Sequence, residues 1–219
     1  MVNQELSDTD RLLLVNKPLG WTSFDVVNKL RYKLKIKKIG HAGTLDPLAT
    51  GLLIICTGKM TKRIEEFMGL EKEYTGTLIL GQTTPSHDLE TPVSEKRELS
   101  HLTERVIRET AKKFTGTILQ TPPAHSAIRI GGKRAYVLAR KGKDPALQPR
   151  EVLIKDFTIT TINLPAVQFK VVCSKGTYIR SLVRDFGDTL GVGAHLSQLC
   201  RTRIGTYQLA DALSPEQVQ

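Results

Sequence analysis

The sequence is poor in cysteine and in aromatic residues, and both shortages narrow what the protein can do. Three cysteines among 219 residues show no C-x-x-C spacing, which argues against a disulfide framework or a zinc site and favours reduced thiols. Aromatic residues make up only 5% of the chain, so a single-strand binder that relies on stacking is not expected. The five histidines also lack metal-ligand spacing, and we therefore expect no metal site.

Long apolar runs and nucleotide-binding signatures are missing as well. The run Leu52–Cys56 is far too short to cross a membrane, and Met1–Asp8 lacks the features of a signal peptide. Gly58-Lys59 has no first glycine for a phosphate-binding loop, and Gly191–Leu196 has no third glycine for a dinucleotide fingerprint. The sequence therefore predicts a cytoplasmic protein that uses neither ATP nor a nicotinamide cofactor and does not enter a membrane.

Positive charge is abundant. The chain has 32 Lys and Arg against 22 Asp and Glu, a net charge of +10, and an excess of this size favours a polyanionic partner such as nucleic acid. A basic run contributes six of these charges in ten residues: Lys29, Arg31, Lys33, Lys35, Lys37 and Lys38. Such a run is usually a solvated face, but within a basic chain it is equally consistent with a surface that contacts phosphates.

Hydrophobic periodicity indicates a chain of strands with irregularly placed helices. Strand patterns occupy residues 12–15, 52–56, 74–80, 152–164 and 167–173, and helical spacing occurs from Ser23 to 34, over 102–114 and over 179–190. Residues 83–98 read as a long polar loop. No repeat or linker is evident, so we expect one α+β domain, with a central mixed, mainly antiparallel sheet flanked by helices and loops.

The segment Gly40–Gly51 (GHAGTLDPLATG) is the most informative part of the chain. In a purely structural interpretation, Asp46 caps a single helical turn that starts at Pro47 and ends at Gly51. In a functional interpretation, proline holds the preceding residue extended, and a carboxylate fixed in this way can act as a nucleophile or a base. The two interpretations are compatible.

This segment resembles the catalytic motif of the TruB family, the tRNA pseudouridine-55 synthases. Four further segments match the family's motifs in order: Val15–Gly20, Lys72–Tyr74, Cys173–Arg180 and Gly193–Arg203. The resemblance covers roughly residues 11 to 213. It implies the pseudouridine-synthase fold and an isomerase that flips a uridine out of the tRNA T-arm loop, breaks its glycosidic bond and reattaches the base through C5. The uracil stays in the pocket, so the resemblance implies no metal or organic cofactor.

The resemblance also assigns roles to individual residues. Asp46 corresponds to the catalytic aspartate, which attacks the nucleotide or helps to remove its 2′-proton, and Arg180 to the arginine that pairs with it. Tyr74 corresponds to a tyrosine that stacks on the base and assists at C5. The resemblance implies that the substrate is also contacted by His41, Tyr178 and Leu199. It implies a supporting role for Lys17, Gly43 and Asp88. From the residues alone, core packing suits the tyrosines, a turn or core position suits His41, and a solvated helix face suits Arg180.

The chain ends at Gln219, soon after the last motif, without the PUA module that many members carry. We therefore expect residues 1–219 to form a single catalytic domain, with a core of about 11–213 and no PUA domain. The expected partner is the T-arm stem-loop of tRNA, and we expect a monomer without an obligate protein partner. Two alternatives remain open: a tRNA-binding or tRNA-folding chaperone without catalysis, and a related synthase that acts on another RNA.

Overall fold

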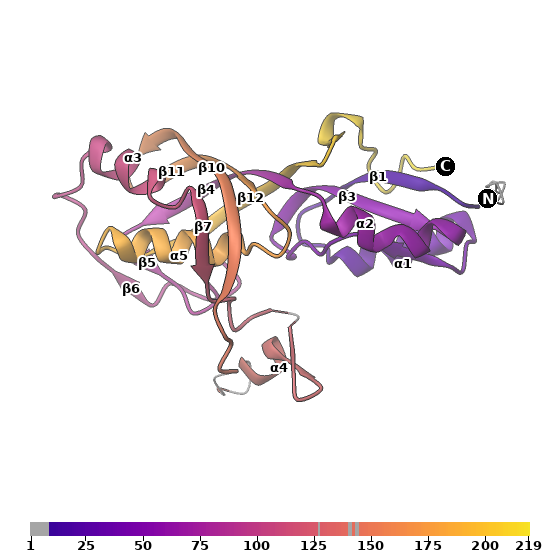
Figure 1. Ribbon diagram of the computed structural model, residues 1–219, viewed down its shortest axis with the longest axis horizontal. Coiled ribbons are helices and arrows are strands. Elements are labelled where there is room, and N and C mark those ends of the chain that lie inside the picture. The colour runs from indigo at the N-terminus through magenta and orange to yellow at the C-terminus, as the bar shows by residue number, and fades with distance from the viewer. Residues whose placement is uncertain (1–8, 127, 140–141, 143–144) are drawn as a thin grey trace. The chain divides into compact units, whose positions relative to one another are not determined.

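The computed structural model describes residues 9–126, 128–139, 142 and 145–219 (Figure 1). The chain divides into two compact units, the first formed by Met1–Thr75 and Leu199–Gln219 and the second by Gly76–Gln198. The strands β4 (Lys72–Leu80) and β12 (Ala194–Ile204) contribute residues to both units. The expectation that both units act as one catalytic domain stays a prediction.

The sheet of the first unit is built around β3 (Ala49–Thr57). On one side β1 (Leu12–Lys17) runs antiparallel to it, from the pair Leu12–Cys56 to the pair Lys17–Gly51. On the other side β12 runs parallel to it, from Leu199–Ala49 to Arg201–Gly51. Two short strands complete this part: β2 (Ile39–His41) pairs with β3, and β13 (Tyr207–Gln208) pairs with β12.

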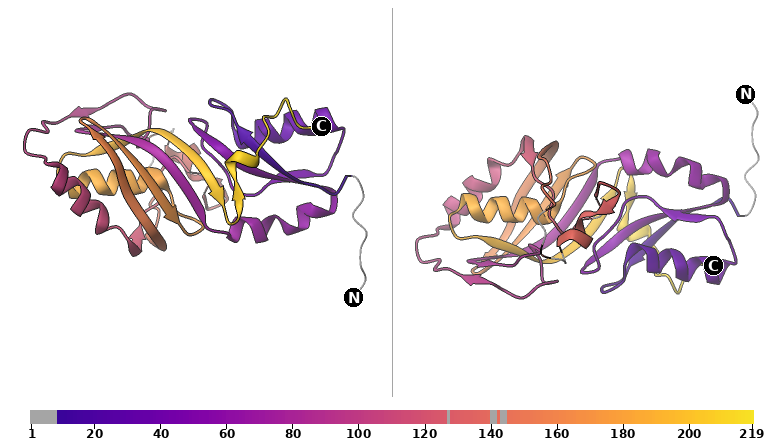
Figure 2. Two further views of the ribbon diagram at one scale, coloured as in Figure 1. Left: turned by 90° about the horizontal axis from the view of Figure 1, so that it is seen from above. Right: turned by 90° about the horizontal axis from the view of Figure 1, so that it is seen from below.

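Both faces of β3 are buried, which explains its unbroken apolar run from Leu52 to Cys56. Leu53 and Ile55 pack with Val26, Val27 and Leu30 of α1 (Ser23–Leu34). The alternate residues of β3 pack on the other face, against the 3₁₀ helix η1 (Gly58–Arg63) and the helix α2 (Ile64–Gly69). Figure 2 shows α1 and α2 on opposite faces of this sheet. A second 3₁₀ helix, η2 (Leu209–Asp211), follows β13.

The helix α1 begins at Ser23, where the helical spacing begins, and the residue before it provides the cap. Thr22 is the N-cap: its hydroxyl accepts from the backbone N–H of Asp25, and the Asp25 carboxylate accepts from the backbone N–H of Thr22 in return. This reciprocal arrangement is a capping box. Ser23, which also suits a cap, is instead buried and bonded elsewhere.

The second unit contains three strands that pair antiparallel in sequence order, β7 (Gly116–Gln120), β10 (Arg150–Asn163) and β11 (Ala166–Cys173). The strand order is β12-β4-β11-β10-β7. The helix α5 (Ile179–Thr189) packs on this sheet through Phe186, whose ring lies 5.4 Å from that of Phe157. The remaining elements are α3 (Glu104–Lys112), α4 (Ala135–Ala139), and the paired short strands β5 (Gln82–Thr83) with β6 (Glu95–Lys96) and β8 (Arg129–Ile130) with β9 (Lys133–Arg134).

The predicted fold class is confirmed: the sheet is mixed and mainly antiparallel, and helices accompany it. The predicted strands and helices are also present, with small shifts at their ends. The elements that were not predicted include β7, the whole of β12, α2, and the short strands β5 and β6 in the region expected to be a loop. Among the described residues, no helix is both long and apolar enough to span a bilayer.

Candidate active site

Asp46 lies in the loop of residues 42–48 that joins β2 to β3 in the first unit, and we call this segment the Asp46 loop. The residue is half-buried, and its carbonyl accepts from the backbone N–H of Ala49 at 3.0 Å. Pro47 and Leu48 form a turn and not a helical turn, so the purely structural interpretation of this segment was wrong. Gly51 lies inside β3 with φ of +102°, where a Cβ atom would stand 2.4 Å from the carbonyl oxygen of Arg201. This glycine therefore permits the close parallel approach of β12 and does not end a helix.

Ser23 holds the loop on the N-terminal side of Asp46. Its buried hydroxyl accepts from the backbone N–H of Leu45 at 2.8 Å and donates to the carbonyl of the same residue at 3.3 Å. One side chain at the start of α1 thus satisfies both polar groups of the residue directly before Asp46. A buried polar group of this kind is costly to leave without a partner, so the pair fixes the loop against the helix.

Lys17 holds the loop on the C-terminal side of Asp46. Its side chain is buried, and Nζ donates to the carbonyls of Pro18 at 2.9 Å, Trp21 at 2.5 Å and Pro47 at 3.3 Å. Burial lowers the pKa of Lys17 to about 8, while the negative charge of Asp46 opposes this shift. The carbonyl of Pro47 also accepts from the backbone N–H of Gly20 at 2.9 Å. These contacts tie the turn 17–21 to the Asp46 loop.

Arg201 is a third anchor of the loop, and the sequence did not reveal it. It comes from β12, is 1% exposed, and donates from Nε to the carbonyl of Leu52 at 2.7 Å and from Nη2 to that of Gly43 at 3.2 Å. Gly43 has φ of +94°, a conformation that glycine adopts without strain. Arg201 lies within the Gly193–Arg203 motif, and its place in that motif was the only signal that the sequence offered.

The other sequence-predicted residues of the first unit come from three strands. His41 ends β2 opposite Ile55, and burial, with a smaller effect from Arg201, lowers the pKa of its ring, which is therefore neutral at pH 7. Leu199 pairs with Ala49, three residues after Asp46, and is half-buried. Tyr74 is a buried residue of β4. Their roles at a bound base stay predictions.

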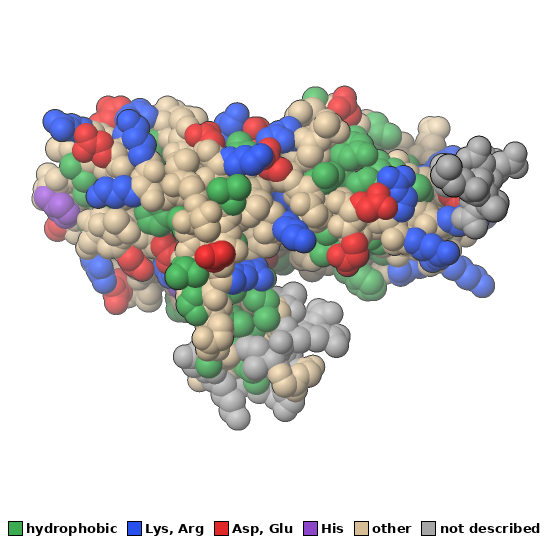
Figure 3. All heavy atoms as spheres, in the orientation of Figure 1, with side chains coloured by type: hydrophobic (Ala, Val, Ile, Leu, Met, Phe, Trp, Pro, Cys, Tyr) green, Lys and Arg blue, Asp and Glu red, His purple; other side chains and the backbone are tan. Residues whose placement is uncertain are grey.

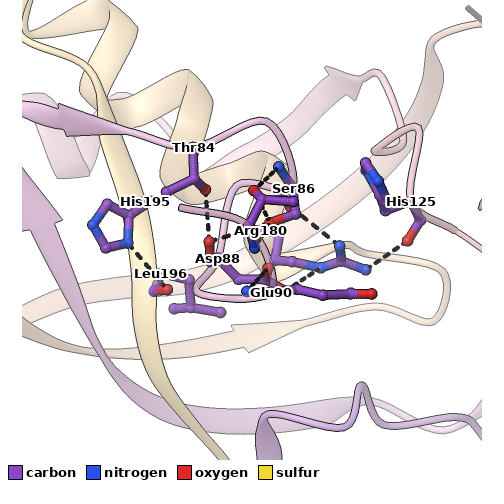
Figure 4. Close-up of polar contacts among 9 residues, drawn as sticks. Thr84, Ser86, Asp88, Glu90, His125, Arg180, His195 and Leu196 are labelled. Atoms are coloured by element: carbon purple, nitrogen blue, oxygen red, sulfur yellow. Dashed lines mark hydrogen bonds and ion pairs between the residues drawn. The ribbon is translucent and has the colours of Figure 1, made fainter. Parts of the chain in front are cut away.

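Arg180 lies in the first turn of α5, in the second unit, and is not on a solvated helix face. It is 3% exposed, and its Nε lies 3.5 Å from Oδ2 of Asp88 (Figure 4). Nη1 donates to the carbonyl of Ser86 at 3.2 Å and Nη2 to that of His125 at 2.9 Å. The structure thus brings together two predicted residues, Arg180 and Asp88. The pairing of Arg180 with Asp46, which belongs to the first unit, stays a prediction.

The loop that carries Asp88 is itself held by hydrogen bonds (Figure 4). The hydroxyls of Thr84 and Ser86 donate to the carbonyl of Asp88 at 2.6 and 3.2 Å, and the backbone N–H of Glu90 donates to Oδ1 of Asp88 at 3.0 Å. His87 has φ of +61°, and burial, with the positive charges of Arg184 and Arg180, lowers the pKa of its ring to about 4. The carboxylate therefore faces Arg180 from a fixed loop next to a neutral histidine.

Tyr178, the N-cap residue of α5, is held by a glutamine that the sequence did not reveal. Gln120 of β7 is fully buried, and its amide accepts from the backbone N–H of Tyr178 at 2.8 Å and donates to its carbonyl at 3.1 Å. The guanidinium of Arg150 lies over the Tyr178 ring, 5.0 Å from its centre. Gln120 thus fixes the start of the helix that carries Arg180.

Comparison with known protein families gives two adjoining matches. A family model described as "TruB family pseudouridylate synthase (N terminal domain)" matches residues 31–179, and one described as "tRNA pseudouridylate synthase B C-terminal domain" matches residues 180–219. Curated relatives named tRNA pseudouridine synthase B include proteins from Parabacteroides distasonis, 54% identical over 94% of this chain and 91% of the relative, and from Chlorobaculum tepidum, 48% identical over 97% and 91%.

Solved structures give a similar result. A chain of the structure titled "Crystal Structure of a Cbf5-Nop10-Gar1 Complex" is 30% identical with a TM-score of 0.71, over 91% of this chain and 50% of that one. A chain of "Structure of H/ACA RNP bound to a substrate RNA containing 2'-deoxyuridine" is 27% identical with a TM-score of 0.67, over 94% and 56%. This chain thus corresponds to about half the length of those two chains.

Proposed function

The chain belongs to the TruB family of pseudouridylate synthases, and from this premise we propose that Asp46 is the carboxylate with which it converts the T-arm loop uridine of tRNA, position 55, to pseudouridine. The activity of the family is an isomerisation of uridine within tRNA. The bond from N1 to the ribose breaks, C5 forms the new bond to the same ribose carbon, C5 loses its proton and N1 gains one. Atoms are conserved overall, so no co-reactant is consumed.

The observation that carries the assignment of Asp46 is the immobilised loop around it. Ser23 holds the residue before Asp46, Lys17 and Gly20 hold the residue after it, and Arg201 holds Gly43. A reacting group that is fixed before the substrate arrives does not lose its freedom during the reaction. Ser23, Lys17 and Arg201 are all buried. Burying polar and charged groups costs free energy unless they form hydrogen bonds, and here the bonds go to the Asp46 loop and its neighbours.

We assign the electrostatic part of the site to buried cations. In the first unit, the charges of Lys17 and Asp46 act on each other and favour the ionised carboxylate. Arg180, aimed by Asp88 and by two carbonyls, is proposed to pair with Asp46 in the assembled site. An opposite charge at this position keeps a carboxylate ionised when a nucleotide excludes water from it.

The base-binding part of the proposal uses flat and apolar side chains. We assign Tyr74, Tyr178 and Leu199 to the binding of the extruded uracil, with stacking worth about 1–3 kcal/mol per base. His41 is proposed to occupy the space that the flipped base leaves in the RNA loop, and its neutral ring suits that position. Flipping costs a few kcal/mol, which basic contacts to the tRNA backbone offset.

We further propose that the protein acts in the cytoplasm, as a monomer and without an obligate protein partner.

The relatives that cover most of this chain and of their own length are named for tRNA. The titles of the solved structures name a Cbf5-Nop10-Gar1 complex and an H/ACA RNP, but those chains are about twice as long as the matched region. Length and identity therefore favour tRNA over another RNA as the substrate.

The test maps the product in RNA. Unmodified tRNA transcript is incubated with the protein, treated with a carbodiimide that forms a stable adduct with pseudouridine, and read by reverse transcription. We expect one new stop, one nucleotide 3′ of position 55, and none with a transcript that carries cytidine at position 55. Pseudouridine at a different position would reject the proposed site specificity, and no pseudouridine in any tRNA would favour a binding protein or chaperone.

A further inference from the structure

The geometry points to a second RNA-contacting surface, formed by α1 and the turn that follows it, which binds phosphates of the substrate tRNA away from the Asp46 loop. This inference rests on the proposed function, because it takes tRNA as the ligand. We call the surface the α1 basic surface, and its cations are Lys29, Arg31, Lys33, Lys35, Lys37 and Lys38.

These cations are accessible and have no acidic partner among the described residues. All are exposed except Arg31, which is half-buried. Within the described part of the chain, none of the six forms an ion pair with a carboxylate. Arg31 bonds the side chain of Asn28 and Lys33 bonds the carbonyl of Glu216, so two of them have neutral acceptors only. No Asp or Glu occurs from residue 26 to residue 45, and the surface is therefore strongly positive.

The helix α3 shows how the same chain treats a surface helix whose charges are balanced. There Arg105 pairs with Glu109 at 2.8 Å and Arg108 with Glu104 at 2.7 Å, both with a spacing of four residues. In α1 the same spacing places Lys29 beside Lys33, and like charges at this spacing destabilise a helix. The charge pattern of α1 therefore opposes the stability of the helix, which suggests that it serves a ligand.

A purely structural explanation accounts for only part of the surface. Cations in the last turn of a helix interact favourably with its dipole. This interaction explains Arg31 and Lys33, which lie in the last turn of α1. Lys29 lies in the middle of α1, and Lys37 and Lys38 lie beyond its last turn. The dipole effect falls off within one turn, so it does not explain these three residues.

Two exposed aromatic rings favour RNA over other polyanions. Tyr32 is 87% exposed and Phe24 is 58% exposed, and the guanidinium of Arg31 lies over the Phe24 ring, 5.8 Å from its centre. Nucleotides combine phosphates with flat bases, so cations interleaved with aromatic rings suit them. Figure 3 shows Lys and Arg side chains on one face of the molecule.

The position of α1 within the first unit connects this surface to the site. The first residue of α1, Ser23, bonds Leu45 next to Asp46, while Lys33 lies ten residues further along the helix, about 15 Å away at the α-helical rise. An RNA strand that presents its base to Asp46 can therefore follow α1 and place phosphates a few nucleotides away on the basic surface.

The test compares two triple variants that lose the same charge. Lys29→Gln, Lys37→Gln and Lys38→Gln together alter the α1 basic surface, and Lys96→Gln, Lys112→Gln and Lys113→Gln together remove three exposed lysines elsewhere. Binding of unmodified tRNA transcript to the full chain is measured against salt concentration. The plot of log K against log salt has a negative slope, and each lost phosphate contact reduces the magnitude of this slope by about 1. We expect the substitutions in the α1 variant to reduce the magnitude of the slope by about 2–3 and to weaken tRNA binding about tenfold or more near 0.1 M salt.

The control variant is expected to keep the wild-type slope and affinity. Equal weakening in both variants would overturn the inference, because only net charge would then matter. Wild-type binding by the α1 variant would also overturn it, and would leave an acidic protein or a membrane surface to be tested as the partner. Circular dichroism melting of both variants shows whether they are folded. Pseudouridine formation by the wild type tests the proposed function independently, so the two failures are distinguishable.

Discussion

The ammonium group of Lys17 donates a hydrogen bond to the carbonyl of Pro47, the residue directly after Asp46, at 3.3 Å. This contact joins the end of β1 to the Asp46 loop through a charge that is fully buried. The loop is therefore held by electrostatics as well as by shape, and the protonation state of one lysine affects how Asp46 is presented.

We predict an alkaline decline in activity that originates at Lys17. Burial lowers the pKa of this residue from 10.5 to about 8, so the ammonium is charged below pH 8 and loses its proton above it. The neutral amine attracts Asp46 and the carbonyl of Pro47 less strongly than the ammonium group does. Single-turnover rates of the wild type should therefore fall as the pH rises through about 8. Lys17→Met should be slower throughout and lack this decline, and a decline of the same shape in the variant would exclude Lys17 as its source.

Two neighbouring hydroxyls should separate helix stability from catalysis. Thr22→Ala removes the cap of α1 and should lower the free energy of unfolding by about 1 kcal/mol without changing kcat. Ser23→Ala leaves both polar groups of Leu45 without a partner, at a cost of about 1–3 kcal/mol. It should also lower kcat about tenfold to a hundredfold by releasing the Asp46 loop. Urea unfolding and single-turnover kinetics provide the two readouts, and equal kcat values for both variants would refute the role given to Ser23.

Arg201→Lys tests the anchor contributed by β12. One ammonium group cannot reproduce the two bonds that the guanidinium makes to Leu52 and Gly43. We expect a loss of about 2 kcal/mol in the free energy of unfolding and a lower kcat. Arg105→Lys is the control, because Arg105 pairs with Glu109 at an exposed position of α3, where such pairs contribute about 0–1 kcal/mol. The account of the loop would be wrong if the two variants behaved alike.

Gln120→Leu tests how Tyr178 is positioned. The change removes the acceptor for the N–H of Tyr178 and the donor to its carbonyl. Since Tyr178 is assigned to the binding of the uracil, we expect KM for tRNA to rise and kcat to fall, while Gln168→Leu, at an exposed position of β11, should leave both unchanged. Restored kinetics in Gln120→Glu would show that the acceptor alone suffices. Wild-type kinetics in Gln120→Leu would refute the role given to Gln120.

Local sequence was sufficient for elements whose burial is simple. The strand β3 has an unbroken apolar run because both of its faces are buried, and α5 shows a clear apolar stripe that includes Phe186. The strand β12 was not predicted because Ser197, Gln198 and Arg201 interrupt its apolar pattern. Arg201 is nevertheless buried, since carbonyls of distant segments satisfy its guanidinium.

Contacts between distant segments explain what the sequence could not show about the site. Ser23 suits a helix cap locally, and only its bond to Leu45, 22 residues away, reveals its role. Gln120 and Tyr178 are 58 residues apart. The resemblance to a family named the reacting groups, but the side chains that position them depend on which backbone atoms the fold brings near.

The most direct test of the account is whether Asp46 is required for the chemical step and not for binding. Unmodified tRNA with tritium at C5 of its uridines is incubated with excess wild type or Asp46→Asn, and tritium release is followed in a single turnover. We predict release by the wild type, none above background by Asp46→Asn, and equal affinity of both for tRNA. Release by Asp46→Asn at the wild-type rate would contradict the central claim.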